Sequence, residues 1–209
     1  MLKLLLQKLF CMETEKLSMM DPGYYEYLLV IHPDAEVNEK VMAEKQIFYD
    51  DYGEKDAIRT KPQIAVANFL AKEAMEDTFI RWMQIIFSKQ QSFQVALNNY
   101  SGLPPHTIYL RVQNAAPIQQ LANELKVVNT YVSSCSCPPM KLISRPHISI
   151  AGRLTEEVYF KALTQYAHKS FHETFLVNEL LLVKRKHPYD ICKPINVFRL
   201  LPGANEIFN

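Results

Sequence analysis

The residues best suited to chemistry lie in a short stretch that joins an imidazole to a hydroxyl. Residues 145–149 read Arg-Pro-His-Ile-Ser, so a single apolar residue separates His147 from Ser149. Side chains alternate between the two faces of a strand, so the imidazole and the hydroxyl share one face while Ile148 points to the other. An imidazole transfers protons near neutral pH, and a hydroxyl donates and accepts hydrogen bonds. The stretch therefore holds groups that general acid–base chemistry uses.

A second stretch has the same or a chemically similar residue at every position but two. Residues 61–67 read Lys-Pro-Gln-Ile-Ala-Val-Ala and residues 145–151 read Arg-Pro-His-Ile-Ser-Ile-Ala, so the differences in kind are Gln63/His147 and Ala65/Ser149. The strand period predicts two matching faces, formed by Gln63, Ala65 and Ala67 and by His147, Ser149 and Ala151. We expect the varying positions to face a cleft, and the isoleucines between them to face a core.

The two stretches occupy equivalent places in a repeated order of elements. Aromatic and branched runs between turn residues predict strands, and apolar residues at helical spacing predict helices. The first half contains expected strands at 24–31, 61–69 and 91–98, helices at 36–49 and 70–89, and a loop at 50–60. After a Gly-Leu-Pro-Pro break, the second half contains expected strands at 107–113, 145–151, 171–183 and 195–201, helices at 117–131 and 155–168, and a loop at 133–139.

This order predicts an internally duplicated α+β protein. Two strand–helix–strand–helix–strand halves, followed by a last strand, are expected to pack about a pseudo-twofold axis with a cleft between their sheets. The predicted organisation is an N-terminal extension over 1–20 and one two-lobed domain over 21–209, with lobes at approximately 24–100 and 104–201. Ligand sites favour such interfaces, so we expect the functional groups there.

Composition limits the class of protein. The chain has 209 residues, 48% of them apolar, and its net charge of +1 gives no indication of a nucleic acid or membrane partner. No apolar run approaches the ~20 residues of a membrane span, and the basic, apolar start lacks a signal-peptide cleavage site. The cysteines form no CxxC pair and no array with zinc spacing; they are Cys11, Cys135, Cys137 and Cys192. We therefore expect free thiols, no metal and a cytoplasmic location.

The matched stretches and the duplicated order resemble the 2H phosphoesterase superfamily, which includes the 2′-5′ RNA ligase-like proteins and the cyclic phosphodiesterases. Each lobe of such a protein has a strand with the motif H-x-[ST], where x is apolar. The resemblance covers about Tyr24 to Leu201: Pro-His-Ile-Ser is similar to the second motif, and Pro-Gln-Ile-Ala occupies the place of the first with both polar positions lost. It implies two antiparallel sheets around a central cleft, with helices on the outside.

The resemblance also implies a reaction. Opening a 2′,3′-cyclic phosphodiester uses one imidazole to activate the nucleophile and a second to protonate the leaving oxygen, without a metal or other cofactor. The reverse direction is RNA ligation. Because Gln63 cannot transfer a proton, the rate should fall by roughly 10²–10⁴-fold. We therefore expect a monomer that acts on or binds RNA ends or small cyclic nucleotides with weak or lost activity, and that has neither DNA nor a membrane as a partner.

The expected site combines both motif strands. His147 and Ser149 are the candidate catalytic residues, and Gln63 is a neutral partner for the substrate. Lys61 and Arg145 open the two strands and are candidates for phosphate binding, although each position suits a plain surface residue equally well.

A basic run near the C-terminus is the last candidate. Lys184 and Arg185 begin the sequence Lys-Arg-Lys-His at 184–187, and Tyr189 follows. These residues would form a phosphate-attracting rim on which Tyr189 stacks a base. The alternative is a solvated hairpin loop.

Three functional interpretations stay open. The first is an enzyme that works with one motif histidine, rescued by His106 or by the substrate itself. The second is a non-catalytic module for nucleotides or RNA ends, and the third is a scaffold whose cleft no longer binds. The enzyme needs a second proton-transfer group within reach of His147. His106 lacks the H-x-[ST] register and His32 ends a strand at a Pro turn, so we expect both to be structural.

Overall fold

The computed structural model describes residues 23–104, 106–187 and 190–203, so the expected extension at 1–20 and Tyr189 lie outside the described residues. The elements in chain order are β1 Tyr24–Ile31, α2 Ala35–Tyr52, α3 Lys55–Arg59, β2 Ile64–Lys72, the 3₁₀ turn η1 Glu73–Met75, α4 Glu76–Phe87, β3 Phe93–Leu103, β4 Thr107–Val112, α5 Ala116–Glu124, α6 Lys126–Ser134, β5 Lys141–Leu142, β6 His147–Ala151, α7 Glu156–Tyr166, β7 His172–Val177, β8 Glu179–Arg185 and β9 Lys193–Arg199.

The strands form two antiparallel sheets, which confirms the predicted α+β class. One sheet has the order β5-β2-β1-β8-β9 and the other β6-β4-β3-β7. Each half of the chain contributes strands to both sheets: β3 pairs with β4 of the second half, and β8 pairs with β1 of the first. The two sheets therefore do not coincide with the sequence segments 24–100 and 104–201.

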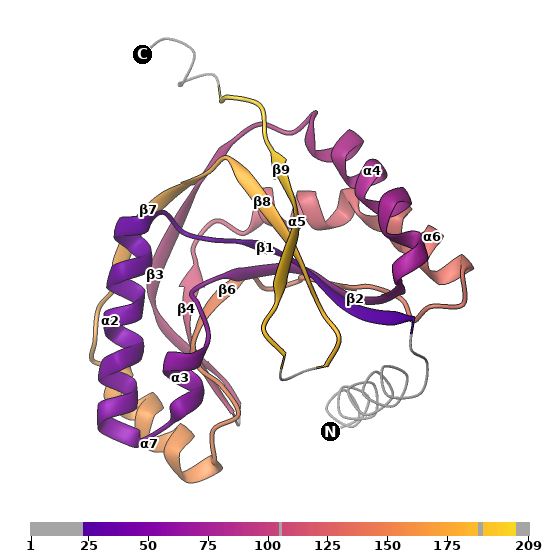
Figure 1. Ribbon diagram of the computed structural model, residues 1–209. Helices are drawn as coiled ribbons and strands as arrows, with labels where there is room; N and C mark the ends of the chain where they lie inside the picture. The colour runs from indigo at the N-terminus through magenta and orange to yellow at the C-terminus, as the bar shows by residue number, and fades with distance from the viewer. Residues whose placement is uncertain (1–22, 105, 188–189, 204–209) are drawn as a thin grey trace.

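The helices cover the outer faces of both sheets (Figure 1). Helices α2, α3 and α7 contact the four-stranded sheet, while α4 and α5 contact the five-stranded sheet and α6 packs on α4. The helix that links β1 to β2 thus lies behind the other sheet. Aromatic pairs mark both layers, since Tyr27 and Phe79 join the five-stranded sheet to α4, and Tyr100 and Tyr166 join the four-stranded sheet to α7.

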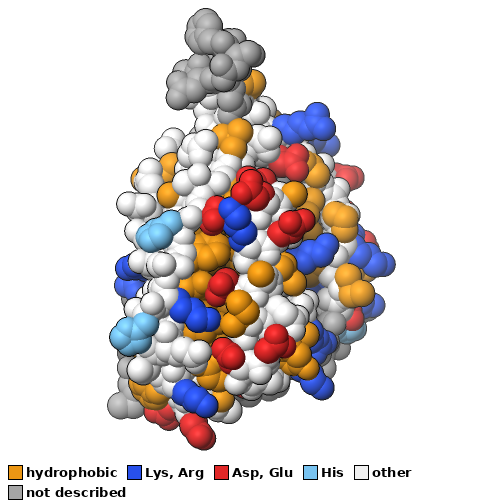
Figure 2. All heavy atoms as spheres, turned by 90° about the vertical axis from the view of Figure 1, so that its left-hand side faces the viewer, with side chains coloured by type: hydrophobic (Ala, Val, Ile, Leu, Met, Phe, Trp, Pro, Cys, Tyr) orange, Lys and Arg blue, Asp and Glu red, His pale blue; other side chains and the backbone are white. Residues whose placement is uncertain are grey.

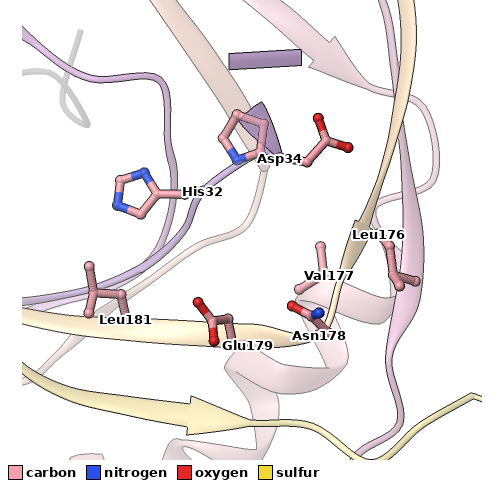
Figure 3. A pocket seen from close by; sticks show the side chains of 8 residues that line it. His32, Asp34, Leu176, Val177, Asn178, Glu179 and Leu181 are labelled. Atoms are coloured by element: carbon pink, nitrogen blue, oxygen red, sulfur yellow. The ribbon is translucent and has the colours of Figure 1, made fainter. Parts of the chain in front are cut away.

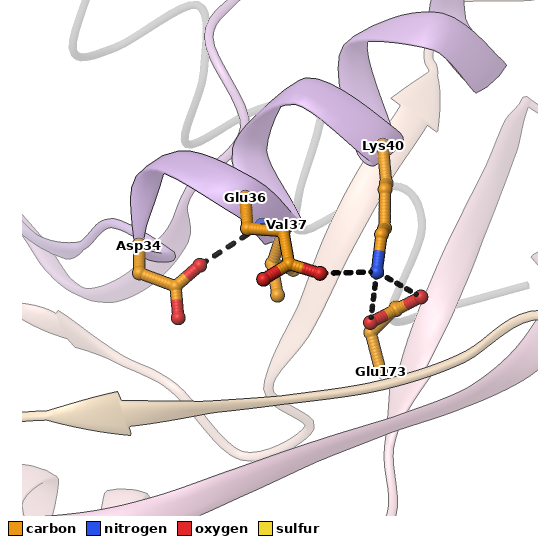
Figure 4. A network of polar contacts seen from close by, with 5 residues as sticks. All are labelled: Asp34, Glu36, Val37, Lys40 and Glu173. Atoms are coloured by element: carbon orange, nitrogen blue, oxygen red, sulfur yellow. Dashed lines mark hydrogen bonds and ion pairs between the residues drawn. The ribbon is translucent and has the colours of Figure 1, made fainter.

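Helix α2 is fixed at both ends and at its side. Asp34 caps its start by accepting a hydrogen bond from the backbone N–H of Val37 at 2.9 Å, and Gly53 ends it in the left-handed conformation. Lys40 bonds Glu36 at 2.7 Å and Glu173 of β7 at 2.9 Å, which ties the helix to the edge of the four-stranded sheet (Figure 4). Seen from this side, the surface carries acidic and basic side chains interspersed rather than a field of one sign (Figure 2).

Three predicted elements differ from those in the structure. The expected strand 171–183 is two strands in different sheets, because the chain passes from β7 to β8 at Asn178. The expected helix 117–131 is α5 followed by α6, with a break in helical geometry at Leu125. The expected loop 50–60 contains the short helix α3.

Candidate functional site

The two motif segments run side by side in opposite directions. Beyond the middle of β2, Ala67 pairs with Leu142 and the N–H of Ile143 donates to the carbonyl of Val66 at 2.9 Å. Residues 143–146 then lead to His147 at the start of β6, which belongs to the four-stranded sheet. Cα atoms of β2 and β6 also lie within 8 Å of one another. The strand that follows Gln63 and the strand that begins with His147 therefore approach each other.

A buried lysine fixes the other end of this arrangement. Lys45 of α2 is 1% exposed, and its Nζ lies 3.1 Å from Thr60 Oγ1 and 3.1 Å from the carbonyl oxygens of Ser149 and Ile150. One ammonium group therefore joins the segment before Gln63 to the strand that carries Ser149. Burial lowers the pKa of Lys45 to about 8, because the charged form loses its hydration.

The predicted alternation of faces is present at the motif positions. Ile64 and Ile148 are fully buried, whereas Gln63, His147 and Ser149 are half-buried. The apolar residues anchor each strand to the helices behind it, and the polar positions face away from that core.

The expectation that Ala67 and Ala151 share the polar face is wrong. Both are buried, at 1% and 2% exposure. Each motif strand has a register shift just before this alanine, at Leu29/Val30 of β1 and at Ile108/Tyr109 of β4. A bulge inserts one residue and reverses the alternation beyond it, so the two lobes share this irregularity.

The imidazole of His147 is held in one orientation. Its Nδ1 lies 2.8 Å from the carbonyl oxygen of Arg145, and because a carbonyl only accepts, Nδ1 carries the hydrogen. In the neutral ring the lone pair is then on Nε2, which suits a general base, and protonation of Nε2 gives an N–H that a phosphate oxygen can accept. The ring of Tyr109 packs against it with centroids 4.7 Å apart.

The predicted basic residues divide into two groups. Arg145 and Lys61 are exposed and precede the motif strands, close to His147 and Gln63. Lys184 instead bonds Glu73 at 2.9 Å and Glu76 at 2.7 Å, so two carboxylates balance its charge.

Arg185 is also removed from the motif. It bonds Glu26 at 2.6 Å, and its strand pairs with β1 at that residue. Glu26 is six residues from His32, a distance of roughly 20 Å along a strand. The structure thus places Lys61 and Arg145 just before the two motif strands, and it engages Lys184 and Arg185 in ion pairs with Glu73, Glu76 and Glu26.

Two residues outside the predicted site stand beside the motifs. Arg111 pairs with His147 across β4 and β6, is exposed, and donates from Nε to the carbonyl of Asn98 at 3.1 Å. His32 follows Ile31, which pairs with Ile64, and its Nδ1 lies 3.0 Å from the carbonyl oxygen of Pro62. Neither is visible in a motif, because both depend on which residue of a neighbouring strand is in register.

The substitute histidine considered from the sequence lies elsewhere. His106 Nδ1 is 2.9 Å from the carbonyl oxygen of Leu154, beyond the C-terminal end of β6, whereas His147 begins that strand. His106 is therefore not placed to complete the motif.

Two cavities lie on the described surface. One of about 280 Å³ is lined by His32, Pro33, Asp34, Leu176, Val177, Asn178, Glu179 and Leu181 (Figure 3). A second, of about 400 Å³, is lined by Ser92, Asn178, Glu179, Arg199, Leu200, Leu201 and Pro202. Within the described ranges, no group of three or more His, Cys, Asp or Glu side chains is arranged to hold a metal, and no helix has the length and apolarity to cross a membrane.

Comparison with known proteins identifies the class. The model of the 2′-5′ RNA ligase superfamily matches residues 50–188, which is more than half of the chain, so this protein belongs to that superfamily. No curated protein sequence matches the chain.

Solved structures show the same fold. E. coli LigT in complex with 3′-AMP superposes with a TM-score of 0.64 at 15% identity, covering 85% of this chain and 98% of LigT. A phosphoesterase gives a TM-score of 0.64 at 14% identity, covering 85% of this chain and 98% of its own. TT0787 of Thermus thermophilus gives 0.62 at 14% identity, covering 84% of this chain and 97% of its own. At these identities the likeness establishes the two-lobed fold.

Proposed function

We propose that the protein binds RNA ends or small cyclic nucleotides that carry a 2′,3′-cyclic phosphodiester, between Gln63 and His147, and that turnover by a two-motif reaction is weak or lost there. The observation that carries this proposal is the approach of β6, which begins with His147, to β2, which follows Gln63, with Nδ1 of His147 held by the carbonyl of Arg145. Membership in the 2′-5′ RNA ligase superfamily supports the substrate class. LigT, which shares the fold, has been crystallised with 3′-AMP, phosphate, ATP and NADP+.

The residues around His147 supply contacts for a phosphate. The Nε2 atom of His147 donates to a phosphate oxygen when protonated, and the hydroxyl of Ser149 follows on the same face of β6. Arg145 and Arg111 are exposed cations next to the imidazole, and Arg–phosphate hydrogen bonds are among the strong ones. All of these groups come from one chain, so a monomer has the complete site.

The first motif strand contributes binding without proton transfer. The amide of Gln63 donates to a phosphate oxygen, but it neither gives up nor accepts a proton at neutral pH. Ala65 offers no polar atom. Because a positioned acid or base contributes roughly 10²–10⁴-fold in rate, affinity should survive here better than turnover.

The test is binding of a labelled oligoribonucleotide that ends in a 2′,3′-cyclic phosphate, measured by fluorescence anisotropy. His147→Ala should weaken binding about tenfold or more, because hydrogen bonds to charged groups contribute roughly 1.5–3 kcal/mol. Ser149→Ala should weaken it less. His106→Ala is the matched control, because it removes an imidazole with the same kind of Nδ1–carbonyl bond at a remote position.

The proposal would be overturned by wild-type protein that does not bind the oligonucleotide, which would favour the scaffold interpretation. Equal binding by wild type and His147→Ala would also overturn it, since the ligand would then sit elsewhere. An oligodeoxynucleotide with a 3′-phosphate checks the preference for RNA ends, and should bind more weakly.

A further inference from the structure

His32 lies where the first motif lacks a histidine. Ile31 of β1 pairs with Ile64 of β2, so the next residue on each strand places His32 beside Gln63. Val30 pairs with Ala65 in the same ladder, and with a strand period of two His32 continues the face of Val30. The imidazole therefore belongs to the face that carries the two altered motif positions.

The imidazole of His32 is oriented like that of His147. Its Nδ1 lies 3.0 Å from the carbonyl oxygen of Pro62, the residue before Gln63, and the corresponding distance from His147 to Arg145 is 2.8 Å. A carbonyl accepts only, so both rings carry hydrogen on Nδ1 and leave Nε2 for proton transfer. Each ring is thus attached to the backbone just before a motif position.

The strand order sets the separation of the two rings. His32 follows β1, β2 is the neighbour of β1, and β2 approaches β6, which begins with His147. One strand spacing of ~4.8 Å separates β1 from β2, and Cα atoms of β2 and β6 lie within 8 Å of one another, so β2 is the one strand between the end that carries His32 and the strand that begins with His147. Displacement at phosphorus needs a base and an acid on opposite sides of the phosphate, each within about 3 Å of an oxygen. A phosphate bound against β2 would lie between the strand end that carries His32 and the strand that begins with His147.

The surroundings of His32 leave room beside it. It lines the cavity of about 280 Å³ together with Leu181 of β8, and Figure 3 shows the ring projecting away from Asp34 and Asn178. The charged groups on this cavity are Asp34, which caps α2, and Glu179 of β8. The imidazole is half-buried rather than enclosed in the core.

We propose that His32 is the second proton-transfer group of the site, in the role that the first motif histidine would fill; this inference rests on the proposed function. In ring opening, Nε2 of one imidazole takes a proton from water as the water oxygen bonds to phosphorus. The bond from phosphorus to one ribose oxygen breaks, and the other imidazole, as imidazolium, gives its Nε2 proton to that oxygen. The product is a phosphomonoester, and solvent restores both rings.

The test is steady-state hydrolysis of adenosine 2′,3′-cyclic phosphate over a range of pH, with binding of the same nucleotide measured in parallel. His32→Gln keeps a side-chain donor for the carbonyl of Pro62 and should lower kcat by roughly 10²–10⁴-fold with little change in binding. It should also remove one limb of a bell-shaped pH–rate profile. His106→Gln is the matched control and should leave kcat unchanged. Adding Gln63→His to His32→Gln should restore turnover, because the imidazole returns to the neighbouring strand.

Wild-type kcat in His32→Gln would overturn the inference, as would binding without any turnover by the wild type, in which case the proposed binding site stands. Absence of both binding and turnover in the wild type removes the proposed function and this inference together. Loss of turnover in His32→Gln with retained binding and rescue by Gln63→His supports it.

Discussion

Replacing Lys45 by Met tests whether a buried cation holds the two motif strands together. Lys45 is 1% exposed and donates to Thr60 Oγ1 and to the carbonyls of Ser149 and Ile150 at 3.1 Å. Burial lowers its pKa from 10.5 to about 8. The folded protein therefore carries a charge whose desolvation is only partly offset by these hydrogen bonds.

The pKa shift of Lys45 determines the size and the sign of the change in the free energy of unfolding with pH. A displacement from 10.5 to about 8 corresponds to about 3 kcal/mol, at 1.36 kcal/mol for each pKa unit. Below pH 8 both states are protonated and the cost is present in full. Between pH 8 and 10.5 the unfolded state binds more protons than the folded state, so the free energy of unfolding rises with pH.

The measurement is urea unfolding of wild type and Lys45→Met at intervals from pH 7 to the unfolded pKa of 10.5. Across the interval from 8 to 10.5, wild type should gain about 3 kcal/mol relative to the variant. Burial raises the pKa of Tyr27, and such tyrosines lower stability at the alkaline end in both proteins. Their effect cancels in the difference between wild type and variant.

Lys40→Met is the matched control on the same helix. Hydrogen bonds to Glu36 and Glu173 raise the pKa of Lys40 to about 12, so its contribution changes above 10.5, outside the interval. A constant difference between wild type and Lys45→Met from pH 8 to 10.5 would refute the reasoning. So would an equal rise in the Lys40→Met comparison.

Three further predictions concern the cap of α2, the packing at Gly102 and the charges near the site. Asp34→Ala removes the N-cap of α2 and should lower the free energy of unfolding by about 1 kcal/mol in urea titrations, whereas Asp34→Asn should restore most of it. Gly102→Ala would place a methyl group against the buried hydroxyl of Tyr159 and should cost about 1–3 kcal/mol; an unchanged melting temperature would contradict the packing. Lys184→Met should leave nucleotide affinity in the anisotropy assay unchanged, because two carboxylates balance the charge of Lys184. Arg111→Met should weaken binding in the same assay, because Arg111 pairs with His147. Weaker binding by Lys184→Met with unchanged binding by Arg111→Met would contradict the site.

The sequence predicted the fold class because the apolar pattern of each half is strong. Ile64 and Ile148 are fully buried as the alternation requires. The pattern could not show that β3 belongs to the four-stranded sheet and β8 to the five-stranded sheet. Hydrophobic alternation identifies a strand but not the strand with which it pairs. For the same reason, the expected strand 171–183 looked continuous although Asn178 divides it between two sheets.

The order of residues along the chain was enough to predict the motif residues. It was not enough to predict the residues that strand pairing places beside them. Gln63 and His147 were paired from the matched stretches alone, and the strands β2 and β6 that carry these stretches approach within 8 Å between Cα atoms. Arg111 and His32 are brought to them by strand pairing, which neither stretch encodes. Lys184 was included as part of a basic run, but its ion pairs form with residues 108 and 111 positions away.

The retained architecture explains how the first motif could change without loss of the fold. In each motif strand the isoleucines are buried and the residues that differ between the two stretches are half-buried, so the core does not depend on the side chains at positions 63 and 65. The bulge before Ala67 matches the bulge before Ala151, so the backbone of the altered strand keeps the shape of the intact one. A strand that keeps its shape still presents its neighbours to the cleft, and His32 is the neighbour with an imidazole. The role that we propose for His32 therefore requires no change in the backbone of either motif strand.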